Sequence, residues 1–467
     1  MPPTLCRPPH ASRLASIAAL AAIATACVHE GSATAPLQPQ ILAADEPPKV
    51  TTAAAAKVRL DPERIDPDTA RAEAARILAA VAAARQRPVT GEVTVDVIDK
   101  AGIRDFAKAS LYEFTTPAEL AMHGRIEASL GVVPPGSDPE AVILDLLEQG
   151  VLGLYDPKRK TLFIGDFVPR SALSMVVGHE IAHGLQDMVF DLHALQKPLL
   201  HRSDAESARR FLVEGEAQAA YLAWVSGERG LDALEDTVLQ AMGDQALQLA
   251  GVASPYPVLA RSLQMPYADG AATVVRLAKR KGWGAIDDLY RRLPESTEQM
   301  LHLDKLLARE LPLTVRLDAR GIDPLLRAAG LVPVWHDELG EAALLSMLAE
   351  RHGPLEAREA AAGWGGDHYL AYEAADAQGS GARPSTVVAA TAWDTAADAA
   401  QFVDAFASYL AEHAAAGHVI DRRGNRVVFA TGIPEAVDVA ALRKALWRGT
   451  QVGRAVSQAE AAPSVTR

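Results

Sequence analysis

The stretch "VVGHEIAHGLQD", residues 177–188, constrains the fold most, because it places two histidines and a glutamate inside an apolar run. Four residues turn a helix by about 400°, so His179 and His183 lie on one face, one turn apart. The opposite, core-facing stripe consists of Val177, Ile181, Leu185 and Met188. The sequence therefore predicts a helix over residues 171–189 that packs on one face and carries paired imidazoles on the other.

Two imidazoles at this spacing can both reach one Zn²⁺ at about 2.0–2.1 Å. Glu180 is rotated about 100° from His179, so it is not expected to bind the same ion but can contact a water in an open coordination position. This is the HExxH arrangement of two ligands and a general base. Gln186 or Asp187 is expected to hold an imidazole in place. The alternative is a solvated helix face that happens to contain two histidines.

A catalytic zinc needs a third protein ligand, and the cysteine count limits the choice. The only cysteines, Cys6 and Cys27, lie in the first thirty residues, so the third ligand must be His, Asp or Glu. The segment "FLVEGEAQAAY", residues 211–221, lies in a predicted helix over 203–226 and offers Glu214 and Glu216. Glu214 has apolar neighbours, whereas Glu216 faces another side and is expected at the surface. The alternative is a helix with two glutamates in salt bridges.

Several segments together resemble gluzincin-type bacterial zinc metallopeptidases. They are "GLYDP…TLFI", "HEIAHGLQDMVFDL", "VEGEA", "STEQMLH" and "AAAGWGGDHYLAY", and they span most of residues 90–430. The resemblance implies that Glu214, the first glutamate of E-x-x-A, is the third zinc ligand. It also implies that Glu180 is the catalytic base. The family usually has proline after the histidine of "TEQxLH", where this chain has Leu303 after His302.

The predicted fold class is α+β. Residues 59–312 are expected to form a mostly helical, zincin-like metallopeptidase domain with a small mixed sheet. Residues 313–452 are expected to form a smaller C-terminal α+β domain, followed by a polar tail over 453–467. "VLGLYDPKRKTLFIGD" is predicted to form a hairpin. Its second strand, residues 161–166, is expected to be an edge strand that pairs with the substrate backbone, with plain sheet structure as the alternative.

His302 is a candidate donor to the oxyanion of a tetrahedral intermediate, as a downstream His or Tyr is in thermolysin-like enzymes. Tyr155 and Tyr267 are weaker candidates for that role. Ser296 and Gln299 could form a capping box, in which case the segment is only a helix start. Four other histidines are expected to be structural or solvated: His193, His201, His336 and His368.

The N-terminus has the pattern of an export signal. Arg7 and Arg13 precede "LASIAALAAIATA", and small residues lead to Cys27. This resembles a bacterial lipobox, although Ala24 stands where leucine is usual. We therefore expect a signal peptide over 1–26, a lipid anchor on Cys27 and a disordered tether over 27–58. Val28 favours the outer membrane. The alternative is an ordinary secretory signal with a chance cysteine.

Charge and motifs together indicate a function. The net charge of −13 and the lack of a basic stripe argue against a nucleic-acid partner. We expect an exported outer-membrane lipoprotein, periplasmic or at the cell surface, that binds one Zn²⁺ per chain and hydrolyses peptides or proteins. The alternatives are a lipid-anchored binding or scaffold protein that keeps the fold without proteolysis, and a purely structural zinc.

Cys27→Ser should move the protein from the membrane to the soluble fraction, because the acylated side chain would be lost. Cell fractionation and labelling with a palmitate analogue measure both effects. A wild-type protein that is soluble and unlabelled would contradict the lipid anchor.

Overall fold

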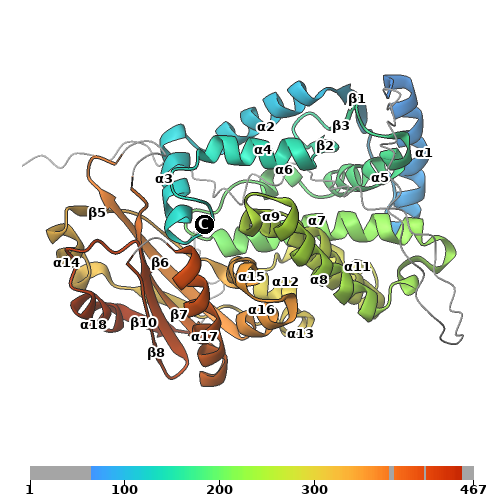
Figure 1. The fold of residues 1–467 in the computed structure, drawn as a ribbon. Coiled ribbons are helices and arrows are strands. Elements are labelled where there is room, and N and C mark those ends of the chain that lie inside the picture. The colour runs from blue at the N-terminus through green and yellow to red at the C-terminus, as the bar shows by residue number, and fades with distance from the viewer. Residues whose placement is uncertain (1–64, 378–382, 415–416, 455–467) are drawn as a thin grey trace, which may run out of the picture.

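The computed structural model describes residues 65–377, 383–414 and 417–454 (Figure 1). Cys27, the predicted signal peptide, the tether and nearly all of the predicted tail lie outside these residues. The described part is α+β, mostly helical with small sheets, as predicted. None of its helices is long and apolar enough to cross a membrane.

A three-stranded mixed sheet lies beside the helix that carries the paired histidines. Strand β3 (Thr161–Gly165) pairs in parallel with β1 (Thr94–Ile98) and antiparallel with β2 (Gly153–Asp156). Helix α5 (Arg170–Asp187) contains both histidines, and it packs with α1 (Pro67–Arg85) and α7 (Ser203–Val225) in one hydrophobic cluster with the sheet. The predicted helices over 171–189 and 203–226 are thus confirmed as α5 and α7.

The strand order corrects the expected substrate edge. The order is β1-β3-β2, so β3 is central and hydrogen-bonded on both sides. Residues 161–166 therefore cannot supply the edge strand. The open side next to α5 belongs to β2, the first strand of the hairpin. The sequence predicts a hairpin from two apolar runs around a turn. It does not show that an earlier strand, β1, pairs with the second strand of this hairpin.

Further helices build the rest of the described chain. Before α5 come α2 (Lys100–Phe114), α3 (Pro117–Ser129) and α4 (Pro139–Gly150). After α5 and around α7 come α6 (Leu192–Leu195), the 3₁₀ turn η2 (Gly227–Ala233), α8 (Asp236–Ala253), α9 (Pro257–Met265), α10 (Ala271–Lys281), α11 (Gly284–Arg291), α12 (Thr297–Leu301) and α13 (Leu303–Ala308). A π-helical turn, η3 (Pro266–Gly270), joins α9 to α10.

The C-terminal part is built on a five-stranded antiparallel sheet in the order β5-β6-β7-β9-β8. The strands are β5 (Leu331–Asp337), β6 (Trp364–Ala374), β7 (Thr386–Trp393), β8 (Val419–Arg423) and β9 (Arg426–Thr431). A two-stranded sheet pairs β4 (Thr314–Leu317) with β10 (Thr450–Gly453). The helices are η4 (Ala319–Gly321), α14 (Asp323–Ala328), α15 (Gly340–Arg351), α16 (Pro354–Ala361), α17 (Ala396–His413) and α18 (Val439–Gly449).

The two parts of the chain share a core. The largest hydrophobic cluster joins α7 to α10 with α15, α17 and the inner face of β6 and β7. Figure 1 shows α15 between the helical part and the sheet. A second cluster covers the other sheet face with α14 and α18. The division at residue 312 stays a prediction, because burial is continuous across it.

Gly215 allows α7 to touch η3. A Cβ at Gly215 would lie 2.4 Å from the carbonyl carbon of Gly270, and one at Gly270 would lie 2.5 Å from the Phe211 oxygen. These atoms belong to backbones, so a side chain cannot simply turn away. The glycine of "VEGEA" is therefore explained by close helix approach.

Gly215→Ala should lower the free energy of unfolding by about 1–3 kcal/mol, because overpacking forces the two backbones apart. Urea denaturation measures the change. Gly284→Ala is the control, since a Cβ there meets no atom within 4 Å in the described structure. Equal stabilities for the two variants would contradict the close-contact explanation.

Candidate metal centre

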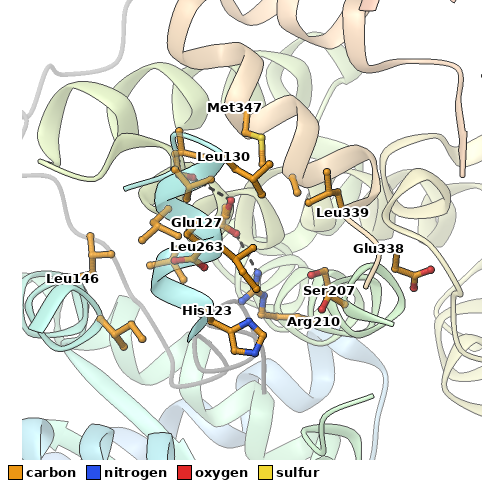
Figure 2. A pocket seen from close by; sticks show the side chains of 18 of the residues that line it. His123, Glu127, Leu130, Leu146, Ser207, Arg210, Leu263, Glu338, Leu339 and Met347 are labelled. Atoms are coloured by element: carbon orange, nitrogen blue, oxygen red, sulfur yellow. Dashed lines mark hydrogen bonds between the residues drawn. The ribbon is translucent and has the colours of Figure 1, made fainter. Parts of the chain in front are cut away.

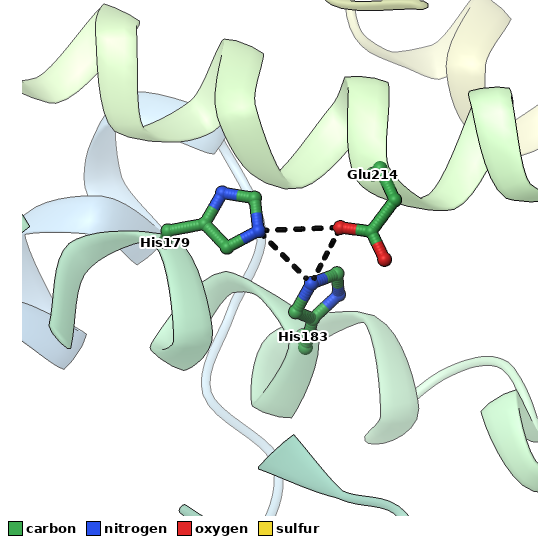
Figure 3. A group of neighbouring side chains, drawn as sticks. All are labelled: His179, His183 and Glu214. Carbon is green, nitrogen blue, oxygen red and sulfur yellow. Dashed lines mark hydrogen bonds and ion pairs between the residues drawn. The ribbon is translucent and has the colours of Figure 1, made fainter. Parts of the chain in front are cut away.

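His179, His183 and Glu214 converge on one point between α5 and α7 (Figure 3). The two Nε2 atoms lie 3.2 Å apart. Glu214 Oε2 lies 3.3 Å from Nε2 of His179 and 3.2 Å from Nε2 of His183. Tetrahedral zinc with bonds of about 2.0–2.1 Å places its ligand atoms about 3.3 Å apart. The predicted ligands therefore have the spacing that such an ion requires.

The hydrogen-bond network fixes the tautomer of His183. The Gln186 amide nitrogen donates to the Val213 carbonyl oxygen at 2.8 Å, so the amide oxygen must be the atom that faces His183. That oxygen lies 2.8 Å from Nδ1 of His183 and accepts its proton. The Nε2 lone pair is then left for the convergence point, as a metal ligand requires. Nδ1 of His179 lies 3.2 Å from the Gln218 side-chain oxygen, which suits the same tautomer.

Glu216 has a different environment from the one expected. It is 1% exposed, so the expectation of a surface side chain was wrong. Its carboxylate accepts from Arg85 at 2.6 Å and lies 3.0 Å from Arg87. These cations lower the pKa of Glu216 against the opposing effect of burial. Glu216 also accepts from the Gln186 amide at 3.0 Å. Glu216 therefore helps to fix the Gln186 amide, which in turn orients His183.

Without a metal ion, His183 and Glu214 behave as an ion pair, each favouring the charged form of the other. Burial opposes ionisation of both groups, but the carboxylate raises the pKa of His183 to about 9, and the imidazoles lower the pKa of Glu214 to about 2. A proton thus occupies the position that a cation would take. Binding of a metal ion would displace that proton, so affinity would fall as the pH falls.

Glu180 lies beside the triad and is fully buried. Neither carboxylate oxygen makes a hydrogen bond of ordinary geometry in the described structure, although the Tyr155 backbone N–H faces the group. Burial raises the pKa of Glu180 to about 6, with the neighbouring imidazoles opposing the shift. A buried carboxylate without a strong partner is costly, which indicates a site made for a further polar molecule.

The edge of β2 that does not pair with β3 lies next to Glu180. The Gly165 N–H donates to the Leu152 carbonyl, and antiparallel pairing alternates along the strands. The backbone groups of Gly153 and Tyr155 therefore point away from β3. A Cβ at Gly153 would lie 3.5 Å from Glu180 Cγ, so the strand runs directly beside the carboxylate.

A cleft reaches the triad at His179, which forms part of its wall. Its volume is about 340 Å³, and Gln218, Gln264 and Tyr267 supply polar groups to its wall. The Tyr267 ring lies 5.3 Å from the His179 ring, centre to centre. Tyr267 is therefore the candidate oxyanion donor that the structure places next to the triad.

His302 and Tyr155 lie in other contacts. Nε2 of His302 is 2.7 Å from Glu341, and this carboxylate raises the pKa of the imidazole although burial opposes the shift. Ser296 caps α12 by accepting from the Gln299 N–H, but the Gln299 side chain accepts from the Glu295 N–H at 2.9 Å, so only half of the expected capping box is present. The Tyr155 hydroxyl donates to Asp187 at 2.8 Å. Between the two expected supports of an imidazole, Gln186 fills that role, whereas Asp187 bonds to Tyr155.

The four histidines expected to be structural contact one another or neighbouring side chains. His201 stacks on His336 with ring centres 3.7 Å apart, and His368 lies 5.4 Å from His336. His193 lies beside Phe114. One more acidic group, Glu298 with Glu310 and Asp394, surrounds Lys305, whose ammonium contacts all three carboxylates. Lysine is thus the cation there.

Comparison with known proteins concerns only the C-terminal part. Residues 332–465 match a family described as a domain of unknown function (DUF8575). No curated protein and no solved structure matches the chain. The matched segment begins in β5 and contains none of the triad residues, so the metal centre must be interpreted from its own geometry.

Gln186→Leu should weaken zinc binding about 10- to 100-fold, because Nδ1 of His183 loses the acceptor that fixes its tautomer. Titration against a competing chelator measures the affinity. Gln245→Leu is the control, since Gln245 is exposed and lines the cleft next to His179. Unchanged affinity in Gln186→Leu would show that the glutamine does not orient the ligand.

Proposed function

We propose that the protein is a zinc-dependent, gluzincin-type metallopeptidase with a zincin-like fold. The observation that carries this proposal is the 3.2–3.3 Å triangle of ligand atoms beside a buried carboxylate that lacks a strong partner. His179, His183 and Glu214 would hold one Zn²⁺, and a fourth position would stay open. Two imidazoles and one carboxylate form a typical catalytic donor set for this ion.

The residues around the triad would divide the steps of peptide hydrolysis among them. Bound zinc supplies a Lewis acid that lowers the pKa of a water molecule towards about 7. Glu180 accepts the proton of the attacking water and delivers it to the nitrogen of the departing amine. The backbone groups of Gly153 and Tyr155 on the open side of β2 pair with an extended substrate. Tyr267 donates to the developing oxyanion, a role for which His302 is less well placed because it bonds to Glu341.

Export completes the proposal. A lipid anchor at Cys27 holds the enzyme to a membrane, with the outer membrane favoured by Val28, and the substrate is a peptide or protein of the periplasm or cell surface. A structural zinc would need a fourth protein ligand. Among the described residues, the group around this point contains three candidate ligands, which favours the open, catalytic arrangement.

The second candidate is a lipid-anchored scaffold that keeps the fold without cleavage. In that case the C-terminal region that contains the DUF8575 match would bind the partner. Glu180 opposes this second candidate, since a scaffold gains nothing from a fully buried carboxylate beside a metal site.

Glu180→Gln should reduce peptidase activity at least about a hundredfold while zinc stays near one per chain, because the amide keeps the volume and cannot accept the proton. Kinetics on casein or a peptide library and metal analysis measure the two effects. Glu214→Ala is the contrasting variant and should lose zinc and activity together. Thermal unfolding should show that Glu180→Gln remains folded.

Two outcomes would contradict this mechanism. A Glu180→Gln protein that holds zinc and cleaves as fast as wild type would exclude Glu180 as the base. A zinc-loaded wild type that cleaves nothing across a diverse peptide library would favour the scaffold.

A further inference from the structure

A second cavity lies between α3, α4, α7, α9 and α15 (Figure 2). Its volume is about 140 Å³, and most of its wall is apolar. Leu130, Leu263 and Met347 are among the side chains drawn around it in Figure 2. A cavity of about 150 Å³ can hold a benzene molecule, so this apolar pocket is large enough for one leucine or phenylalanine side chain.

The apolar pocket and the metal centre lie along the same face of α7. Ser203, Ser207 and Arg210 line the pocket, and their spacing of four and three residues continues to Glu214. Side chains one helical turn apart are about 5–6 Å apart at Cβ, so Arg210, at the end of the pocket, separates it from Glu214 by one turn of α7. The Arg210 guanidinium crosses to α9, where it donates to the Ser262 carbonyl at 3.3 Å.

Helix α9 and the turn η3 form a second wall, along which pocket residues are again followed by cleft residues. Ser262 and Leu263 of α9 line the apolar pocket, whereas Gln264 and Tyr267, which follow directly, line the cleft beside His179. Along α7 the apolar pocket and the polar cleft therefore lie on opposite sides of Glu214, and along α9–η3 they follow each other directly. A chain bound across the metal would meet one on each side.

The ionisable groups of the apolar pocket are compatible with an uncharged occupant. Burial raises the pKa of Glu127 to about 8 and lowers the pKa of His123 to about 4, so both side chains are neutral near pH 7. His123 Nε2 is buried without a hydrogen-bond partner in the described structure. Burial and neighbouring carboxylates hold the pKa of Glu338 well above its usual range. Arg210 is the cation of this wall, but its guanidinium donates to the Ser262 carbonyl oxygen and is attracted by the carboxylates of Glu214 and Glu206.

Part of the wall comes from the DUF8575-matched segment. This segment supplies Glu338, Leu339, Ala343, Met347 and Tyr369. Ala343 and Met347 lie one turn apart on α15, so they face the cavity together. A small residue at 343 leaves room that a larger side chain would fill.

We infer that this pocket binds one apolar side chain of the substrate, of leucine to phenylalanine size, beside the peptide bond held at the metal centre, and that α15 of the matched segment sets the size limit. The inference rests on the proposed metallopeptidase function. It assigns a role in substrate selection to a region whose family has no described function.

The test uses the full, zinc-loaded chain and two measurements. The first is cleavage of a peptide series that differs only in one residue next to the cleaved bond: Leu, Phe, Gly or Asp. Wild type should cleave the Leu or Phe peptide about 10- to 100-fold better than the Gly peptide, the range expected for burying one large apolar group. The second is binding of indole, followed by ligand-observed NMR, which needs no activity.

Ala343→Leu should remove most of the Leu and Phe preference and weaken indole binding at least about tenfold, because the added carbons fill the cavity. Ala349→Leu is the matched control on the same helix and should resemble wild type. Met347→Ala enlarges the pocket and should shift the preference towards residues larger than Phe. This second variant tests the inference even if Ala343→Leu folds poorly.

Different failures point to different conclusions. Cleavage without apolar preference in wild type, or equal effects of Ala343→Leu and Ala349→Leu, would overturn the pocket while leaving the metallopeptidase intact. Indole binding that Ala343→Leu abolishes, in a wild type that cleaves no peptide, would overturn both the proposed function and the substrate role of the pocket.

Discussion

The buried ion pair between Arg85 and Glu216 underlies the arrangement of the metal centre. Its atoms are 2.6 Å apart, and both side chains are about as buried as core residues. Arg87 and Asp287 join the same network, so the end of α1, the middle of α7 and the start of α11 meet there. Removing one partner of such a pair leaves an uncompensated buried charge, which costs about 3–5 kcal/mol. Through Gln186, this network also determines which nitrogen of His183 faces the metal site.

Helix α7 connects the functional parts of the molecule. One face carries the pocket residues, Glu214 and then Gln218, while Glu216 and Gly215 point towards other neighbours. Because α7 is buried on nearly every side, it has no solvent-exposed face for its polar side chains. Its polar side chains must each find a defined partner. Glu214, Glu216 and Gln218 find theirs at the candidate metal centre or in the network behind it, whereas Asp204 and Glu206 accept from the backbone N–H groups of Thr297 and Leu199.

Sequence reasoning placed His179 and His183 together because helical spacing is local information, whereas Glu214 was assigned from the family resemblance. The four-residue interval of His179 and His183 fixes a shared face regardless of the fold, and the helices over 171–189 and 203–226 follow from apolar periodicity. The expected edge strand was wrong because strand order depends on a partner 67 residues earlier in the chain, since Thr94 pairs with Thr161. Glu216 was misjudged for the same reason: its partner Arg85 is 131 residues away. Strand β5 does not stand out in the sequence, since "LVPVWHD" contains a proline and alternates poorly.

The π-helical turn Pro266–Gly270 shows how a local irregularity can direct a side chain. A π turn contains one residue more than an α turn, and its hydrogen bonds are less favourable. Deleting a single residue there would restore a regular helix from Pro257 to Lys281, but every side chain before the deletion would rotate by about 100° relative to α10. If α10 kept its place, the Tyr267 ring would leave the His179 ring, and if α9 kept its place, Gly270 would leave its contact with α7. Evolution of this segment is thus constrained in length rather than only in residue type.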